Sequence, residues 1–543
     1  MTRSKNSINV AVKNLSDFGV SVGLYWLFGY GLMFGLSASG WWGTTQFLPA
    51  FNTDPQLAVF FLFQAMFCGT STTIISGATA ERLKFSAYLV IASWVSGFIY
   101  PTFGHWAWNE TGWLQQLGFF DFAGSTVVHS IGAWVGLAAI ATIGPRKSRF
   151  SPEGKSLKIQ GSNMPFSVLG ALILWFGWIG FNGGSTLAFD DRVPGIIANT
   201  MLGGVSGTIV SAILSLVRYQ FVEVEQLVNG SLAGLVAVTA CASVLDTPMA
   251  AIVGGTGAAI ATLASEGLKY WKIDDAVDAF AVHGAAGIWG TLCVGLFGNL
   301  AAIDTGLSRG IQILAQLLGI VTAFAWAFGL SWGVLKLVDR VFPLRISPRE
   351  EELGLNISEH HAKTETYDLF RVMDYQAKTH DLSLRVPVEP FTEVGHIATR
   401  YNQVMDSFEA RHRQSVDDLA QIYYVTAAVT AAIEHNTFKA ENLGLEEMAQ
   451  RGDEFGSLAR VIQEMVEIVQ QRDRDLLQTR QAAILAVLES RFGEVPEKIR
   501  DRAAKIETRE QFQQWLTRAI ALENIDEVIS VTSDQSLSLK EET

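Results

Sequence analysis

Apolar and polar positions divide the chain into two unlike parts. From roughly residue 18 to residue 336, apolar segments of about 17 to 26 residues alternate with short polar connections. Each such segment is long enough to cross a hydrocarbon core about 30 Å thick. From about residue 339 to residue 543 the sequence is polar and charged, with few Gly or Trp residues, which is typical of soluble helices. The pattern therefore predicts an all-α polytopic membrane protein with a helical tail.

Ten membrane spans are expected, and the connections between them separate by charge. The spans are placed near 18–37, 57–78, 84–101, 123–143, 164–184, 195–217, 230–246, 248–266, 276–298 and 310–335. One set of connections contains basic stretches such as ERLK (81–84) and PRKSRFSPEGKSLK (145–158), whereas the other set holds two arginines and no lysine. The positive-inside rule then predicts that both termini and the tail are cytoplasmic, in a multi-pass plasma (inner) membrane protein.

Composition argues against several classes of function. Much of the net charge of −13 belongs to the polar half, and no block of Arg and Lys is dense enough to predict nucleic-acid binding. The three cysteines, Cys68, Cys241 and Cys293, fall within apolar spans and lack the spacing of metal ligands. We therefore expect buried structural cysteines, with no metal and no other cofactor. The first twelve residues also lack the apolar core of a cleavable signal peptide.

Ionisable residues are rare in the apolar half. They lie at or within the ends of spans, at Asp121, His129, Asp275, Asp278 and His283. Such residues usually face the interior of a helix bundle or a cavity and are candidates for function. The structural alternative is that each Asp caps a helix start by accepting backbone N–H groups, and that a lone His is a satisfied core residue.

Two histidine segments repeat the same pattern. In DFAGSTVVHSIGAWVG (121–136) and DAVDAFAVHGAAGIWG (275–290), the His follows the Asp by eight residues and a Gly follows the His by seven. The expected spans run in opposite directions through the membrane, which is the signature of an inverted-topology repeat. The pattern predicts that His129 and His283 meet on the repeat axis. Neutral imidazoles there can share a proton or pass it on.

These segments resemble the ammonium transporter (Amt/Rh) family, and the resemblance covers roughly residues 3–360. It is carried also by FQAMFCGTSTTIISGATAERLKFSAY (63–88), HWAWNETGWL (105–114), WFGWIGFNGGS (175–185) and LGLNISEHH (353–361). The resemblance implies a homotrimer with one narrow pore per subunit. Family members usually have a further helix before the segment that begins at RSKN (3–6), so we expect ten spans instead of eleven and an unequal repeat, which puts assembly and transport efficiency in doubt.

The resemblance implies an outer recruitment site and a gate. Phe67, Trp108 and Ser185 match the residues that recruit ammonium, and Phe67 and Phe181 match a gate of stacked phenyl rings. Aromatic faces attract a cation by about 0.5–2 kcal/mol, and a hydroxyl can accept an N–H hydrogen bond. Ammonium would then lose its proton, because a bare cation is costly in a narrow apolar passage.

The resemblance also implies the lining of the pore. His129 and His283 match the family's twin histidines, and Trp178 matches a further aromatic residue of the pore. Asp121 matches the aspartate that shapes the backbone around the recruitment site. We group it with the other two aspartates as supporting residues, which are Asp121, Asp275 and Asp278.

The tail resembles relay modules of signalling proteins. Residues 366–414 look like a HAMP module, in which two helices are joined by an extended connector, and a second copy is suggested at 453–476. Aligning Glu393 with Glu454 also aligns two glycines and two alanines. The alternative is a generic coiled coil with a charged solvated face. The last segment, 481–530, resembles a small helical domain found at the ends of some bacterial proteins.

We therefore expect five parts, and we expect no enzymatic activity. The parts are a membrane domain (1–345), a family-type cytoplasmic linker (346–365), a HAMP-like module (366–414), a second HAMP-like or coiled-coil module (415–478) and a small helical domain with a flexible end (479–543). The favoured function is an ammonium channel or transporter coupled to signalling. The alternatives are an ammonium receptor with little or no transport, and a passive scaffold. Ammonium or ammonia, membrane lipid, further copies of the chain and a PII-type regulator or other signalling partner are the expected partners.

Overall fold

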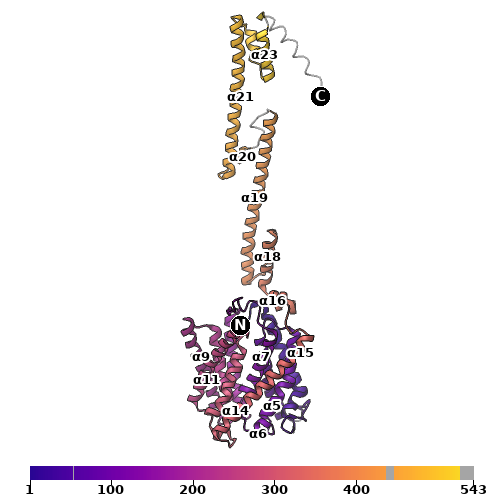
Figure 1. Cartoon of the computed structure of the whole chain (residues 1–543), viewed down its shortest axis with the longest axis vertical. Coiled ribbons are helices and arrows are strands. Elements are labelled where there is room, and N and C mark those ends of the chain that lie inside the picture. Colours follow the sequence, from indigo (N-terminus) through magenta and orange to yellow (C-terminus); the bar gives the residue numbers. More distant parts are fainter. Residues whose placement is uncertain (53, 436–444, 522, 526–543) are drawn as a thin grey trace. The chain divides into compact units, whose positions relative to one another are not determined.

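The computed structural model describes residues 1–52, 54–435, 445–521 and 523–525. The chain forms two compact units, Met1–Tyr367 and Asp368–Thr543, and both consist mainly of helices (Figure 1). We call the first the membrane unit and the second the tail unit. The one strand pair among the described residues joins β1 (Ser37–Ala38) to β2 (Trp42–Gly43).

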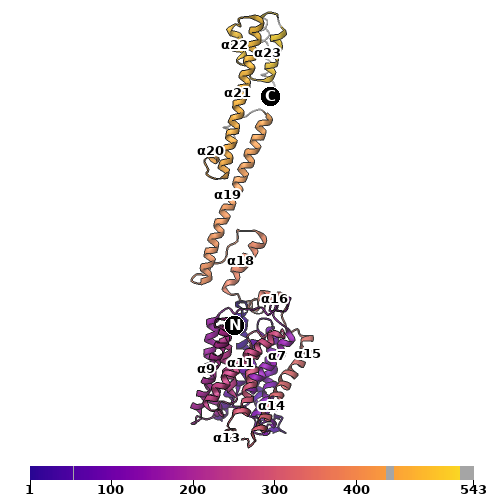
Figure 2. The same ribbon diagram turned by 60° about the vertical axis from the view of Figure 1, so that its left-hand side comes forward.

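The membrane unit is a bundle of long helices with short connections (Figure 2). Its first half contains η1 (Ser4–Asn6), α1 (Ser7–Leu24), η2 (Tyr25–Gly29), α2 (Tyr30–Phe34), α3 (Pro55–Ala78), α4 (Phe85–Trp94), η3 (Val95–Ile99), α5 (Tyr100–Trp108), α6 (Trp113–Gln116), η4 (Ser125–Ser130) and α7 (Ile131–Ile143). Its second half contains α8 (Met164–Gly183), η5 (Gly184–Thr186), α9 (Val193–Tyr219), α10 (Val224–Thr239), α11 (Thr247–Tyr270), η6 (Phe280–Ala285), α12 (Ala286–Phe297), α13 (Leu300–Ile303), α14 (Arg309–Ala323), η7 (Phe324–Leu330), α15 (Ser331–Val341), α16 (Pro348–Leu353) and α17 (Leu355–His360).

Eight helical stretches in the described part of the chain are long and apolar enough to cross a membrane. They are 55–78, 85–116, 125–143, 164–186, 193–219, 247–270, 280–297 and 309–341. The other two expected spans, 18–37 and 230–246, also fall on helices but do not meet this requirement. Helix α10 has 16 residues, so it is only about 24 Å long. The first helix is long enough but begins with polar residues.

The first helix starts at Ser7, well before residue 18, where the first membrane span is expected to begin. Its early polar residues do not end the helix, because they are buried and bonded inside the bundle. Lys13 donates to the carbonyl oxygen of Leu83 at 2.6 Å, and Tyr88 donates to the Asp17 carboxylate. The opposite face carries apolar side chains such as Leu15, which is 75% exposed. The helix is thus polar toward the protein and apolar outward, as a membrane helix at a polar contact requires.

A buried ion cluster ties together three connections on the side of the membrane unit that holds the N-terminus. Arg146 donates two hydrogen bonds to the Asp274 carboxylate, from Nε at 2.8 Å and from Nη2 at 2.9 Å, and Arg149 donates to the same carboxylate at 3.1 Å. Arg146 also lies 3.3 Å from Glu81, which in turn pairs with Arg3 at 2.7 Å. Burial alone would raise the pKa of Asp274, but the arginines around it hold that pKa well below its usual range.

Glycines let the two histidine helices approach closely. A methyl group on Gly287 of α12 would lie 2.5 Å from the Ser125 carbonyl oxygen and 2.6 Å from the Ser130 hydroxyl, both in η4. A methyl group on Gly132 of α7 would lie 2.3 Å from the Ser71 carbonyl oxygen in α3. Only the absence of a side chain permits these contacts, so Gly287 sets how near the two histidine helices can pack and Gly132 sets how near α7 can pack on α3.

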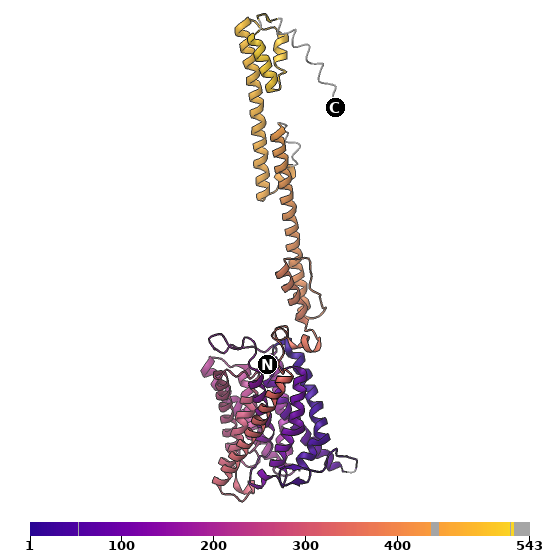
Figure 3. The same cartoon turned by 45° about the vertical axis from the view of Figure 1, so that its right-hand side comes forward.

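The tail unit contains three packed segments along long helices (Figure 3). Its helices are α18 (Glu365–Thr379), α19 (Glu393–His435), α20 (Glu446–Ala449), α21 (Glu454–Phe492), α22 (Glu497–Ala503) and α23 (Arg509–Ala521). In the first segment, Val386 of the connector packs on Leu369 and Val372 of α18 and on Ala398 of α19. The Asn402 side chain bonds both the N–H and the carbonyl oxygen of Val386, at 2.9 Å each, and so fixes the connector.

The second segment repeats local features of the first. Gly395 donates to the Thr392 hydroxyl at 2.9 Å, and Gly456, its aligned counterpart, donates to Asp453 at 3.0 Å. The aligned Ala398 and Ala459 are both fully buried. A third cluster packs the end of α21 against α22 and α23. Residues 436–444 of the expected second module, and 522 and 526–543 of the expected last domain, lie outside the described residues.

The ion cluster gives a prediction for stability. Replacing Asp274→Asn leaves buried arginines without their counter-charge and should lower the free energy of unfolding by about 3–5 kcal/mol, measured by thermal unfolding in detergent. Because the pKa of Asp274 is lowered in the fold, its contribution is present at neutral pH and is lost only as pH falls through the acid range. The exposed Asp191→Asn is the matched control and should change stability by less than about 0.5 kcal/mol. Equal stability of Asp274→Asn and Asp191→Asn would contradict the stabilising role of Asp274 in the ion cluster.

Candidate functional site

His129 and His283 meet inside the membrane unit. Their Nδ1 atoms are 3.2 Å apart, and their rings are nearly parallel, with centroids 5.2 Å apart and planes at 19°. Each His lies in a π-helical turn, η4 or η6, that opens the longer helix α7 or α12. Two facing ring nitrogens at this distance require one proton between them, so one ring donates and the other accepts. His129 is fully buried, and its Nε2 has no partner within the described part of the chain.

Aromatic rings continue from the histidines along one line. The Trp178 ring stacks on His129 with centroids 5.2 Å apart and planes at 17°, and its indole N–H donates to Thr239 at 2.9 Å. Phe181, one helical turn further along α8, lies 5.4 Å from His129 and 4.2 Å from Phe67. His129 is therefore flanked by the rings of Trp178 and Phe181, and Phe67 packs on the far side of Phe181.

A cavity of about 870 Å³ lies beyond the phenyl rings. Phe67, Trp108 and Ser185 all line this cavity, as the sequence predicts for the recruitment site. The Phe67 and Trp108 ring centroids are 5.9 Å apart at 79°. The Ser185 hydroxyl donates to the Phe181 carbonyl oxygen at 2.8 Å, which leaves its own oxygen lone pairs able to accept. The site thus offers two ring faces and a hydroxyl acceptor to a small cation.

Asp121 caps the first histidine helix completely. Its Oδ1 accepts from the N–H groups of Gly124 (2.8 Å) and Ser125 (3.0 Å), and its Oδ2 accepts from Thr126 (2.8 Å) and Val127 (2.9 Å). The Asp121 carbonyl oxygen also accepts from the Trp108 indole N–H at 2.7 Å. The residue therefore fixes both the start of the helix and the orientation of an aromatic residue in the outer cavity.

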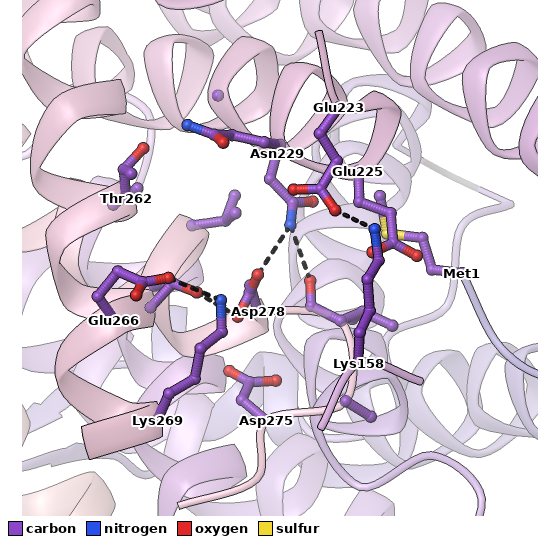
Figure 4. Close-up of a pocket in the computed structure, with 18 of the residues that line it drawn as sticks. Met1, Lys158, Glu223, Glu225, Asn229, Thr262, Glu266, Lys269, Asp275 and Asp278 are labelled. Atoms are coloured by element: carbon purple, nitrogen blue, oxygen red, sulfur yellow. Dashed lines mark hydrogen bonds and ion pairs between the residues drawn. The ribbon is translucent and has the colours of Figure 1, made fainter. Parts of the chain in front are cut away.

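A second cavity, of about 390 Å³, lies at the opposite mouth, among loops that the sequence assigns to the cytoplasm (Figure 4). Asp275 and Asp278 both line it. Asp278 accepts from the Ser265 hydroxyl at 2.7 Å and from the Asn229 amide at 3.3 Å, and its backbone is left-handed, with φ of 60°. These two aspartates are far from the recruitment residues, which line the other cavity. They belong to the second cavity.

The sequence alone did not single out two polar partners at the site. Gln64 lines the outer cavity one helical turn before Phe67, and its Oε1 has no partner in the described structure. The signal was available, because the spacing of three residues puts Gln64 on the same helix face as Phe67. Thr239, which orients Trp178, lies 61 residues further along the chain, and no local pattern points to it.

Comparison with known proteins agrees with this geometry. The sequence model of the Ammonium Transporter Family matches residues 1–365. The chain is 64% identical over 503 residues to the Synechocystis sp. protein sll0537, assigned as an ammonium transporter, a match that covers 91% of this chain and 93% of the relative. It is 40% identical over 383 residues to ammonium transporter Amt2 of Archaeoglobus fulgidus, which covers 66% of this chain and 82% of the relative.

Solved structures show the same relationship. A structure titled Sensor Amt Protein superposes with a TM-score of 0.64 at 39% identity and covers 66% of this chain and 91% of that chain. The Mep2 structure of Saccharomyces cerevisiae superposes with a TM-score of 0.56 at 26% identity and covers 62% of this chain and 79% of that chain. The family is one of multi-pass membrane transport proteins, which are not enzymes. On the fold, the family match and these relatives, the chain belongs to the ammonium transporter family.

Proposed function

We propose that this chain takes up ammonium through a hydrophobic pore that contains the twin histidines. The observation that carries the proposal is the unbroken series of rings from Trp108 through Phe67 and Phe181 to His129 and His283, with contacts between successive members. An apolar passage of this kind excludes ions but admits a small neutral molecule.

Ammonium binds first in the outer cavity in this proposal. The faces of Phe67 and Trp108 attract the cation by about 0.5–2 kcal/mol, and the Ser185 oxygen accepts one of its N–H bonds. Potassium would gain the attraction of the rings but not the directional hydrogen bond. Asp121 supports the site without contacting the ion, because both of its carboxylate oxygens are occupied by backbone N–H groups.

Ammonia then passes the gate and the histidines. The Phe67 and Phe181 rings, 4.2 Å apart, must move aside, and the cost of burying a charge there favours release of a proton before passage. His129 Nε2 is buried without a partner among the described residues, so it is free to donate to or accept from a passing molecule. The proton that the two rings share is a route for charge alongside ammonia.

We infer further that the chain works as a homotrimer in the plasma (inner) membrane with both termini in the cytoplasm. Support for the orientation comes from the basic connections and from the contacts of residues near the N-terminus with the linker after the last span. Asn6 accepts from the Leu355 N–H at 2.9 Å, and Lys5 donates to the Glu351 carbonyl oxygen at 2.7 Å, so the two ends lie on one face. A PII-type regulator is a candidate partner for that face.

The tail unit is proposed to carry a signal through two HAMP-like modules. Support comes from the matching glycines and buried alanines of the two segments, and from a connector bonded to the helix that follows it. The 503-residue match to the Synechocystis protein extends well beyond residue 365, so that transporter relative shares part of the tail. We propose no enzymatic output for it.

A second candidate function is an ammonium receptor with little or no transport. The likeness to a protein titled Sensor Amt Protein favours this reading, because that protein joins a sensor role to the same membrane fold. Both functions use the same ammonium site, and they differ in whether ammonia leaves by the inner mouth. A passive scaffold is disfavoured by the retained site residues.

Transport can be tested with purified protein in liposomes. An ammonium jump should evoke a current in the wild type, and His129→Ala should lower that current by at least about tenfold, because the shared proton is lost. The exposed His412→Ala is the control and should conduct like the wild type. A current that survives His129→Ala unchanged would remove the histidines from the mechanism.

The tail and the receptor alternative can be tested together. Removing residues 368–543 should leave ammonium current within about twofold of the full chain, because the two units are separately compact. In the full chain, a cysteine at the exposed Leu419 should cross-link to a different extent when ammonium is added, and potassium should have no effect. The three native cysteines are buried and should not interfere. Ammonium binding with a changed cross-link but no current would favour the receptor.

A further inference from the structure

The two repeat-related aspartates are bonded differently. Asp121 uses both carboxylate oxygens to accept four backbone N–H groups. Asp275 accepts from the Phe280 N–H through Oδ2 at 2.6 Å, whereas its Oδ1 is buried with no hydrogen-bond partner in the described structure. A buried carboxylate oxygen without a partner is unfavourable, so Oδ1 either carries a proton or meets a ligand.

Asp275 stands between the pore helix and the inner cavity. Its side chain is 6% exposed and lines the cavity of about 390 Å³, beside Asp278 (Figure 4). The residue it caps, Phe280, begins the π-helical turn that holds His283. Ala281 and Val282, directly before that histidine, line the same cavity. Asp275 and the two residues next to His283 thus line one cavity, so a molecule released into that cavity would meet this carboxyl group.

Most of the other acidic groups around Asp275 have hydrogen-bond or ion-pair partners. Asp278 is held by Ser265 and Asn229, as described above. Asp274 is gripped by arginines, and Glu266 accepts from Lys269 at 3.0 Å. Two further acidic residues line the cavity from the start of α10, Glu223, which pairs with Lys158, and Glu225.

Cations face this region from several elements. They are Arg82 before α4, Arg146, Arg149 and Lys158 before α8, Arg218 at the end of α9, Lys269 in α11 and the Met1 amino group. Three of the arginines engage Asp274 and Arg218 engages Glu266, so none of these four donates to Asp275. The carboxyl group is thus surrounded by charges that are satisfied elsewhere.

We propose that Asp275 is the group that returns a proton to ammonia at the inner end of the pore. The inference rests on the proposed transport function and adds its inner proton-exchange step. The O–H bond of the Asp275 carboxyl breaks, and the nitrogen lone pair forms a new N–H bond, which yields ammonium and a carboxylate. Solvent water in the inner cavity then gives a proton to the carboxylate, which restores the acid, and the hydroxide that remains is released to the cytoplasm.

The acidity of the group suits this step. Burial, helped by the negative charge of nearby Asp278, raises the pKa of Asp275 to about 7. Both forms are then populated near neutral pH, which is the condition for efficient proton exchange. The protonated form predominates below this pKa, so donation should be strong at lower pH and should fail as pH rises through it.

The test uses the full chain in liposomes with the same pH on both sides, so that protein orientation does not matter. Asp275→Asn keeps an acceptor for the Phe280 N–H but cannot titrate. We expect the wild-type ammonium current to fall as pH is raised from about 5.5 to 8.5, with a midpoint near the pKa of Asp275. In Asp275→Asn this pH-dependent fall should be missing, and the current at the lower pH should be about tenfold smaller than in the wild type. Asp278→Asn should move the midpoint to lower pH, because a like charge is removed.

A matched control and a second measurement separate the outcomes. Glu225→Gln removes another carboxylate from the same cavity and should keep the wild-type pH profile. Infrared titration should show a protonated carboxyl C=O band that disappears near neutral pH in the wild type and is missing in Asp275→Asn, whether or not the protein conducts. Normal current with an unchanged pH profile in Asp275→Asn would overturn this inference alone. The absence of a protonated Asp275 carboxyl band from the infrared titration would do the same, because the residue would then be only a helix cap or a fixed cation site. Absence of current in the wild type would overturn the proposed function itself.

Discussion

The membrane unit is organised by the requirement that polar groups in hydrocarbon find partners within the protein. The contact between His129 and His283 is the central case, because each ring supplies the partner of the other at 3.2 Å. Neither histidine could be placed there alone at low cost. Gly287 at the crossing of the two histidine helices allows the approach, and the rings of Trp178 and Phe181 stack on His129.

The same requirement explains the buried charged residues of the first helix and of the ion cluster around Asp274. Lys13 and Asp17 are buried within a helix that otherwise faces outward with apolar residues, and each is bonded to the segment between α3 and α4 or to α4. The Asp274 carboxylate pairs with Arg82 and Arg146, which lie in two connections that are far apart in sequence. Polar contacts thus hold together the loops at one mouth, whereas the middle of the unit is held by apolar packing and close glycine contacts.

The sequence predicted the helical class and the positions of most spans, and it singled out Phe67, Trp108 and Ser185, which line one cavity, because apolar length and short motifs are local patterns. It did not predict the start of α1 at Ser7. The polar residues at the start of this helix are typical of a loop, and only their distant hydrogen-bond partners show why they lie in a buried helix. The same holds for Thr239 beside Trp178. The difference between Asp121 and Asp275 is likewise invisible in sequence, where the two segments look equivalent, and it emerges only from the hydrogen bonds of each carboxylate.

The central claim is that the two imidazoles share a proton within the passage that ammonia crosses in the proposed mechanism. Nitrogen NMR of histidine-labelled protein in bilayers measures this directly. The account predicts that the Nδ1 signals of His129 and His283 are coupled across one N–H···N hydrogen bond and that both change when ammonium is added. Two uncoupled histidines whose signals do not respond to ammonium would contradict it.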